Sequence, residues 1–158
     1  MNYRHIYHAG NFADVHKHLV FLLALEYLQQ KDKGLLVLDA FAGCGLYDLD
    51  RPEPQKTGEY LAGIAKIMES PAQNPDLGRF QKLMGMFWAG RQYAGSPVLA
   101  ATLLRQQDRL VANELHPEDA ITLRQNLRGF KNVRVTEEDA YQSIRAQIPP
   151  PEKRGIVL

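Results

Sequence analysis

Residues 37–45, VLDAFAGCG, are the most informative stretch of the sequence. They join a short, continuous apolar run to a turn of small residues that contains Gly43 and Gly45. A continuous apolar run is typical of a strand that is buried on both faces, as in a parallel sheet. Glycines after such a strand permit a tight turn and let a ligand approach the backbone. The stretch predicts a nucleotide-type site after a buried strand; the alternative is a left-handed turn that binds nothing.

The residues around this stretch have helical patterns. Apolar positions at helical spacing predict a helix over residues 11–30, with Asn11 as its N-cap. An irregular loop is expected after residue 50, because RPEPQKTGEY contains two prolines and a glycine. Helices are then expected over residues 59–69 and 76–89, and Ser96 with the following proline opens another helix.

Two further strands are expected in RLVANEL, residues 109–115, and VRVTEED, residues 133–139, each followed by a helix. Alternation of this kind implies an α/β fold, with a parallel sheet that carries helices on both faces. The segment between the first two strands is too long for an ordinary crossover. We therefore expect an inserted helical subdomain over residues 51–95, and an α/β core formed by residues 1–50 and 96–158.

The last ten residues, PPPEKRGIVL, are expected to begin a fourth strand of the core. A chain that ended inside a buried strand would have to solvate its terminal carboxylate in the core. We therefore expect this chain to be part of a longer protein, and the core to be incomplete at its carboxyl end. The alternative is a short edge strand that ends there.

Composition places the chain among ordinary globular proteins. Of its 158 residues 45% are hydrophobic and 23% are charged, and no apolar run approaches the roughly 18 residues of a membrane span. The amino terminus lacks the apolar stretch of a secretory signal and Cys44 is the single cysteine, so a cytoplasmic location without a membrane is expected. The net charge of +1 favours no particular partner. Residues 51–107 are mildly basic, which suits either a phosphate-binding surface or a neutral, solvated one.

Three acidic residues end the three expected strands: Asp39, Glu114 and Asp139. Asp39 precedes the glycines and suits a site for the ammonium group of S-adenosyl-L-methionine. Glu114 can accept both hydroxyls of a ribose, and Asp139 can accept from an adenine amino group. A dinucleotide fingerprint is not matched, because Asp48 stands at the third glycine position. Each acid alone is equally compatible with a helix N-cap.

Four of the five histidines gather near the amino terminus, together with Asp14: His5, His8, His16 and His18. Their spacing is compatible with a metal site, a nucleotide or substrate contact, or a structural role. On a helix that begins near Asn11, Asp14 and His18 share a face, whereas His16 points elsewhere. No metal ligand is assigned.

Six segments together resemble the RlmJ family, whose members methylate N6 of an adenine in 23S ribosomal RNA. The most specific is YRHIYHAGNFADVHKH at residues 3–18, and the others are LDAFAGCGLYDL, TGEYLAGI, AGSPVLAATLLR, ANELHPED and EEDAYQ. The similarity runs from residue 3 to the end of the chain. It implies a Rossmann-like class I methyltransferase fold, with S-adenosyl-L-methionine as cofactor and 23S ribosomal RNA as partner.

The resemblance also implies which residues contact the cofactor. The family's contacts fall on His18, Ser96, Glu114 and Asp139. Phe41 stands where the family usually has a histidine that touches the cofactor, so this chain is expected to lack that polar interaction, and Ala140 stands where a glycine is common. With the residues of the glycine stretch, the expected cofactor-binding set is His18, Asp39, Phe41, Gly43, Gly45, Ser96, Glu114, Asp139 and Ala140.

The catalytic motif of such amino methyltransferases, (N/D)PP(Y/F), is expected just beyond Leu158, where it would hold the flipped base. Tyr3, His5 and Lys17 match the amino-terminal motif that lies beside the reacting centre, and are expected to support it. We therefore expect the chain alone to bind the cofactor without transferring methyl groups.

Two other functions remain open at this point. One is a protein of DNA utilisation or a metal-dependent nuclease that uses the histidines. The other is a non-catalytic nucleotide-binding module. The sequence shows no obligate protein partner.

Overall fold

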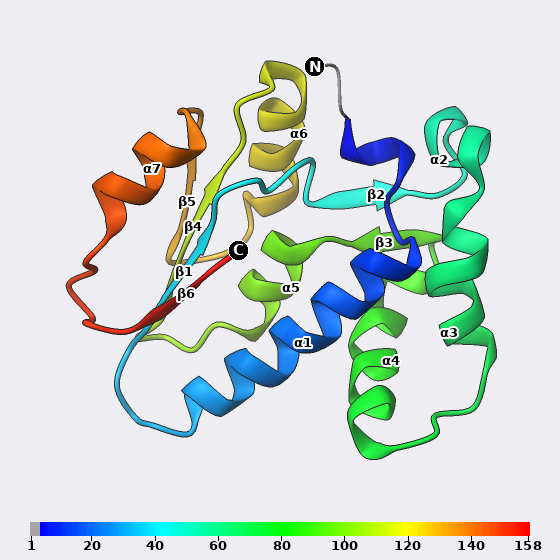
Figure 1. The fold of residues 1–158 in the computed structure, drawn as a ribbon, viewed down its shortest axis with the longest axis horizontal. Helices are drawn as coiled ribbons and strands as arrows, with labels where there is room; N and C mark the ends of the chain where they lie inside the picture. Colours follow the sequence, from blue (N-terminus) through cyan, green and yellow to red (C-terminus); the bar gives the residue numbers. More distant parts are fainter. Residues whose placement is uncertain (1–3) are drawn as a thin grey trace. The chain divides into compact units, whose positions relative to one another are not determined.

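The structure, a computed structural model, describes residues 4–158 (Figure 1). It divides into two compact units. The first unit combines the described residues up to Leu23 with Leu46–Gly95. The second combines Ala24–Gly45 with Ser96–Leu158. Helix α1, Phe12–Gln29, contributes residues to both units, and Asn11 caps it as predicted, because its Oδ1 accepts from the amide of Asp14 at 2.9 Å.

A four-stranded parallel sheet forms the centre of the second unit, in the order β5-β4-β1-β6. The registers pair Val37 with Leu110 and Leu36 with Gly155, all in parallel. The fold class predicted from the alternating pattern is therefore confirmed, and so is a fourth strand near the end of the sequence. The strands are β1 (Leu36–Asp39), β4 (Arg109–Asn113), β5 (Val133–Thr136) and β6 (Gly155–Val157).

Helices cover both faces of this sheet, which explains why β1 is apolar at nearly every position. Ile144 of α7 packs on one face against Leu36, Leu38 and Val111. On the other side of the sheet, α5 contacts β1 and β4, and α6 contacts β5 (Figure 1). The helices are α5 (Ser96–Leu103), α6 (Pro117–Leu127) and α7 (Ala140–Gln147). None of the helices within residues 4–158 is long and apolar enough to cross a bilayer.

The first unit contains an antiparallel pair of short strands, β2 (Leu46–Asp48) and β3 (Gln92–Ala94). Neither strand was predicted, because three residues give too short a pattern for periodicity to detect. Between them lie α2 (Pro52–Thr57), η2 (Leu61–Ala65), α3 (Lys66–Glu69) and α4 (Pro75–Trp88). A 3-10 turn, η1 (His5–Tyr7), precedes α1.

Two predictions for this unit are wrong in detail. The expected irregular loop is a helix over Pro52–Thr57, since proline is well tolerated in the first turn and Gly58, at φ 65°, ends the helix. The expected helix over residues 59–69 contains the π-helical segment η2, where Gly63 has non-helical torsions. A Cβ at Gly63 would lie 2.1 Å from the carbonyl oxygen of Gly10, so this close approach requires glycine.

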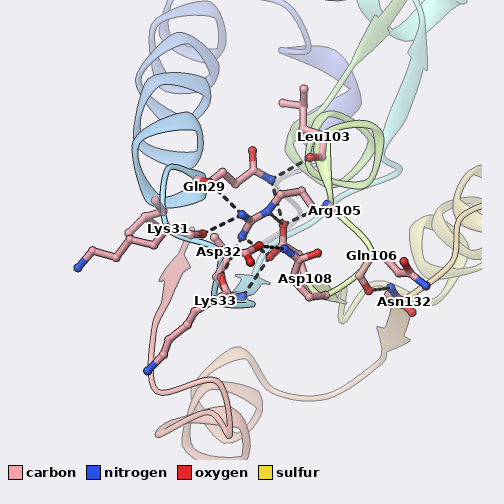
Figure 2. A network of polar contacts seen from close by, with 12 residues as sticks. Gln29, Lys31, Asp32, Lys33, Leu103, Arg105, Gln106, Asp108 and Asn132 are labelled. Atoms are coloured by element: carbon pink, nitrogen blue, oxygen red, sulfur yellow. Dashed lines mark hydrogen bonds and ion pairs between the residues drawn. The ribbon is translucent and has the colours of Figure 1, made fainter.

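A charged cluster fixes the segment that leads from α1 into β1 (Figure 2). The Arg105 guanidinium donates to the carbonyl oxygens of residues 29, 31 and 33 at 2.8–2.9 Å, and to both carboxylate oxygens of Asp108 at 2.9 Å. Asp108 also accepts from the Leu35 amide at 3.2 Å. Because Leu35 and Asp108 precede β1 and β4, the cluster lies at the amino ends of these strands, opposite the glycine turn.

Candidate functional site

The three acids at the ends of β1, β4 and β5 lie at one edge of the parallel sheet. Asp39 is the last residue of β1, Glu114 follows β4, and Asp139 lies between β5 and α7. Because these strands are adjacent and parallel, their carboxyl ends point to the same side. The structure thus brings together the acids that the sequence placed on separate segments.

Asn113 joins the three strand ends through its buried side chain, which is 1% exposed. Its Nδ2 donates to the carbonyl oxygens of Ala40 and Glu138, at 3.2 and 3.0 Å. Its Oδ1 accepts from the Thr136 hydroxyl at 2.8 Å and from the Glu138 amide at 3.0 Å. The site therefore depends on a residue that the sequence analysis did not single out, although it directly precedes Glu114.

Glu114 connects the glycine turn to the end of β4. One carboxylate oxygen, Oε2, accepts from the Gly43 amide at 2.8 Å, and the other, Oε1, accepts from the His116 amide at 2.8 Å. These hydrogen bonds fix the orientation of the carboxylate. Each of its oxygens retains a second lone pair for a ligand hydroxyl.

The glycine turn has the backbone geometry that the sequence predicted. Gly43 and Gly45 have φ values of 60° and 78°, in the left-handed region where glycine is unstrained. A Cβ at Gly45 would lie 2.9 Å from the Leu123 side chain. Asn126 of α6 donates to the carbonyl oxygen of Cys44 at 2.8 Å, so the turn is held against that helix.

The remaining predicted residues of the second unit surround these strand ends in different environments. Asp39 is 2% exposed, and its Oδ1 accepts from the Phe41 amide at 3.3 Å. The Phe41 ring is 71% exposed. Ser96 and Ala140 are buried first residues of α5 and α7. Asp139 caps α7, since its Oδ1 accepts from the amides of residues 141 and 142, which is the helix N-cap alternative for this acid.

The first unit holds a second polar cluster around Asp14, which is 3% exposed. Its Oδ2 accepts from His5 Nε2 at 2.7 Å and from the Gly10 amide at 3.1 Å, and its Oδ1 pairs with Lys17 Nζ at 3.1 Å. Burial raises the pKa of Asp14, but the hydrogen bond from His5 and the nearby positive charges outweigh it and hold the pKa well below its usual range. His5 and Lys17 are thus anchored by one buried carboxylate.

His18 lies on the same face of α1 as Asp14, as predicted, and is 1% exposed. Its Nδ1 is 2.6 Å from the hydroxyl of Tyr93, and the two rings stack with centroids 5.5 Å apart. Burial lowers the pKa of His18 to about 3, although the charge of Asp14 acts in the opposite direction. The imidazole is therefore neutral near pH 7.

The other amino-terminal residues are arranged differently. His8 Nδ1 is 2.9 Å from Glu59 Oε1, His16 is exposed, and Tyr3 lies outside the described residues. Within residues 4–158, no group of three or more histidine, cysteine or acidic side chains is placed to hold a metal ion.

Comparison with known proteins gives consistent matches. The family model described as RsmJ, ribosomal RNA large subunit methyltransferase D, RlmJ, matches residues 32–158. Two curated relatives named ribosomal RNA large subunit methyltransferase J match all of this chain: the Haemophilus influenzae protein at 44% identity and the Escherichia coli protein at 42%. The chain spans 58% of the length of each.

A solved structure agrees with these matches. The crystal structure of a Legionella pneumophila protein, 37% identical, covers 94% of this chain with a TM-score of 0.85, and the match takes in 56% of that protein. The family resemblance read from the motifs is thereby confirmed, and these matches do not favour the nuclease alternative. The strand-end acids, the glycine turn and the amino-terminal cluster thus belong to a member of the RlmJ family of ribosomal RNA large subunit methyltransferases.

Proposed function

We propose that the protein transfers a methyl group from S-adenosyl-L-methionine to N6 of an adenine in 23S ribosomal RNA, and that this chain carries the half that binds the methyl donor. The observation that carries the proposal is the convergence of three acids and a glycine turn at one edge of a parallel sheet, held together by Asn113. Membership of the family supports the same reaction class.

The residues at the strand ends fit the chemistry of the methyl donor. A positively charged ammonium suits the buried carboxylate of Asp39, and a ribose diol suits the two oriented oxygens of Glu114. Within residues 4–158, Oδ2 of Asp139 has no hydrogen bond and can accept from an adenine amino group. A Cβ at Gly45 would lie 2.9 Å from the Leu123 side chain, so the turn packs this closely against α6 only with glycine at this position.

The proposed cofactor set contains the residues that the motifs implied, although the Phe41 ring cannot hydrogen-bond to the donor as a histidine would. Bound S-adenosyl-L-methionine would supply an electrophilic methyl group. The chain's own residues are proposed to orient it, and the proposed set is His18, Asp39, Gly43, Gly45, Ser96, Glu114, Asp139 and Ala140.

The acceptor is proposed to be ribosomal RNA, because the relatives' names specify methylation of the large-subunit RNA. His5 and Lys17 are proposed as supporting groups on the acceptor side, with Tyr3, and Asp14 fixes the first two. Positioning of the amine in line with the methyl group would supply most of the acceleration.

A transfer assay tests the reaction. Tritiated S-adenosyl-L-methionine is incubated with 23S ribosomal RNA that lacks the modification. A protein of the relatives' full length that carries these 158 residues is expected to label the RNA, whereas the 158-residue chain is expected to bind the donor without labelling RNA. No label from the full-length protein would contradict the proposal.

The donor site is tested separately by binding to the chain. Glu114→Gln keeps the size of the side chain but replaces one oriented oxygen by an NH₂ donor, which cannot accept from a hydroxyl or an amide. We expect calorimetry to show at least tenfold weaker binding of S-adenosyl-L-methionine, about 1.4 kcal/mol. Glu69→Gln, an exposed glutamate at the end of α3, is the control and should bind like the parent chain.

A further inference from the structure

The imidazole of His18 has one satisfied nitrogen and one unsatisfied nitrogen. Nδ1 contacts the Tyr93 hydroxyl at 2.6 Å. Nε2 is buried and has no hydrogen-bond partner among residues 4–158. A buried polar atom without a partner loses its hydration without compensation, so native structures rarely retain one without a reason.

The position of the proton in this pair follows from counting donors and acceptors. If the Tyr93 hydroxyl donates to Nδ1, the proton of the neutral imidazole is on Nε2, and one buried donor is left unsatisfied. If Nδ1–H instead donates to Tyr93, both the phenolic proton and the Nε2 lone pair lack a partner. The first arrangement leaves fewer groups unsatisfied, so Tyr93 is the donor.

The surroundings of the pair favour the same assignment. Burial raises the pKa of Tyr93 well above its ordinary value, and Asp14 and Tyr47 raise it further, so the phenol keeps its proton. Tyr93 is fully buried in β3, where its backbone pairs with Tyr47 of β2. A hydroxyl that is held in place by a strand can fix the tautomer of a ring that it contacts.

We propose that Tyr93 is a positioning residue that holds His18 in the Nε2–H tautomer, so that His18 offers an N–H donor to an anionic oxygen of its ligand. The identity of the ligand rests on the proposed function. S-adenosyl-L-methionine carries a carboxylate, and its oxygens can accept a hydrogen bond from His18 Nε2–H. A neutral imidazole is suited to this contact, because it donates a hydrogen bond without requiring a buried charge.

The tautomer is tested directly on the 158-residue chain by NMR of ¹⁵N-labelled histidine at pH 7. Long-range proton–nitrogen spectra are expected to show a protonated Nε2 and an unprotonated Nδ1 for His18. A protonated Nδ1 would overturn the proposal. This measurement uses the parent chain, so it decides the question even if variants at the buried Tyr93 do not fold.

The positioning role is tested with Tyr93→Phe. Removing the hydroxyl is expected to leave His18 as a mixture of both tautomers and to weaken S-adenosyl-L-methionine binding about tenfold, or 1.4 kcal/mol. Tyr27→Phe, at a tyrosine that is 71% exposed on α1, is the control and should change neither. Unchanged affinity in a folded Tyr93→Phe chain would overturn the positioning role.

The two proposals can fail separately. If the parent chain shows the Nε2–H tautomer but does not bind S-adenosyl-L-methionine, the donor-binding function fails while the assignment of the tautomer holds. If it binds the donor with a protonated Nδ1, the function holds and the role of Tyr93 fails.

Discussion

Asn113 shows how a single side chain assembles the candidate site from three separate strands. Its amide group exchanges hydrogen bonds with the segments after β1 and β5, while its own backbone ends β4. Asparagine is suited to this position because one end of its amide donates and the other accepts. A carboxylate of the same size would only accept, and would face the carbonyl oxygens of Ala40 and Glu138.

Replacing Asn113 tests this role. Asn113→Ala leaves two backbone carbonyls, an amide and a hydroxyl without their partner, so we expect a loss of about 2–4 kcal/mol in the free energy of unfolding. Urea denaturation measures it. Gln125→Ala, at an exposed position on α6, serves as the control and is expected to change stability by less than about 0.5 kcal/mol. A similar, small effect of both variants would mean that the strand ends hold together without Asn113.

A substitution at Gly45 tests whether the turn requires glycine. Gly45→Ala forces a residue with a Cβ to φ 78°, and the Cβ would lie 2.9 Å from Leu123, so we expect destabilisation by about 1–3 kcal/mol. Gly85→Ala is the matched control, since Gly85 is within α4 and has open space around it. That substitution should stabilise the chain by about 0.5–1 kcal/mol. Chemical denaturation measures the stability of both variants. A neutral effect of Gly45→Ala would show that the turn does not require glycine.

Residues with local signals were predictable, and residues with distant partners were not. The positions of Asp39, Glu114 and Asp139 near strand ends and of Gly45 in a turn were predicted from the expected strands beside them, and the structure confirms these positions. The roles of Asn113 and Tyr93 depend on partners 73 and 75 residues away in the sequence. No local pattern encodes such pairings, so only the folded chain shows them.

The elements show the same division between local and distant signals. Helices α1, α4 and α6 were predicted from patterns that extend over several turns, and the starts of α1 and α6 carry Asn11 and a proline at the first position. Asn74, which caps α4, was not singled out from the sequence. The strands β2 and β3 have three residues each, and their stability depends on pairing with one another. The π-helical segment forms where Gly63 packs against Gly10, a contact that the sequence pattern does not contain.

The cluster of Arg105 and Asp108 is the element-scale feature that sets where β1 and β4 begin (Figure 2). Arg105→Lys keeps the charge but replaces the planar guanidinium, with its several N–H donors, by a single ammonium group. That group cannot donate to three carbonyl oxygens and a carboxylate together. We expect the free energy of unfolding to fall by about 1–3 kcal/mol, measured by urea denaturation.

Arg128→Lys, an exposed arginine that follows α6, is the control for this substitution and should be neutral. S-adenosyl-L-methionine affinity of folded Arg105→Lys should be unchanged, because the cluster lies at the opposite ends of the strands from the glycine turn. Weakened binding without loss of stability would contradict this separation.

At the scale of the whole chain, the buried His18 makes stability depend on pH. The unfolded chain binds a proton at His18 below about pH 6.5, whereas the folded chain, with a pKa of about 3, does not. The contribution of His18 to the free energy of unfolding is therefore fully present above about pH 6.5. It is lost as the pH falls toward 3, by up to about 1.4 kcal/mol per pH unit. Asp14, whose pKa is also lowered, adds a loss in the same direction below about pH 4.

Urea denaturation at pH 7, 6 and 5 measures this dependence. His18→Gln cannot take up the proton and should show a shallower fall in stability than the parent chain over this range. His16→Gln, at an exposed position of the same helix, should keep the parent slope. Equal slopes in all three chains would contradict the assignment of a neutral, buried imidazole.

The central claim is that the carboxyl ends of β1, β4 and β5 form a methyl-donor site, and an NMR titration tests it most directly. Backbone amide spectra of the ¹⁵N-labelled chain are recorded while S-adenosyl-L-homocysteine, the demethylated cofactor, is added. We predict saturable shifts that include the amides of Gly43, Gly45 and Glu114 and those at the start of α7, with the region around Arg105 unaffected. No saturable shifts, or shifts confined to the amino ends of the strands, would contradict the account.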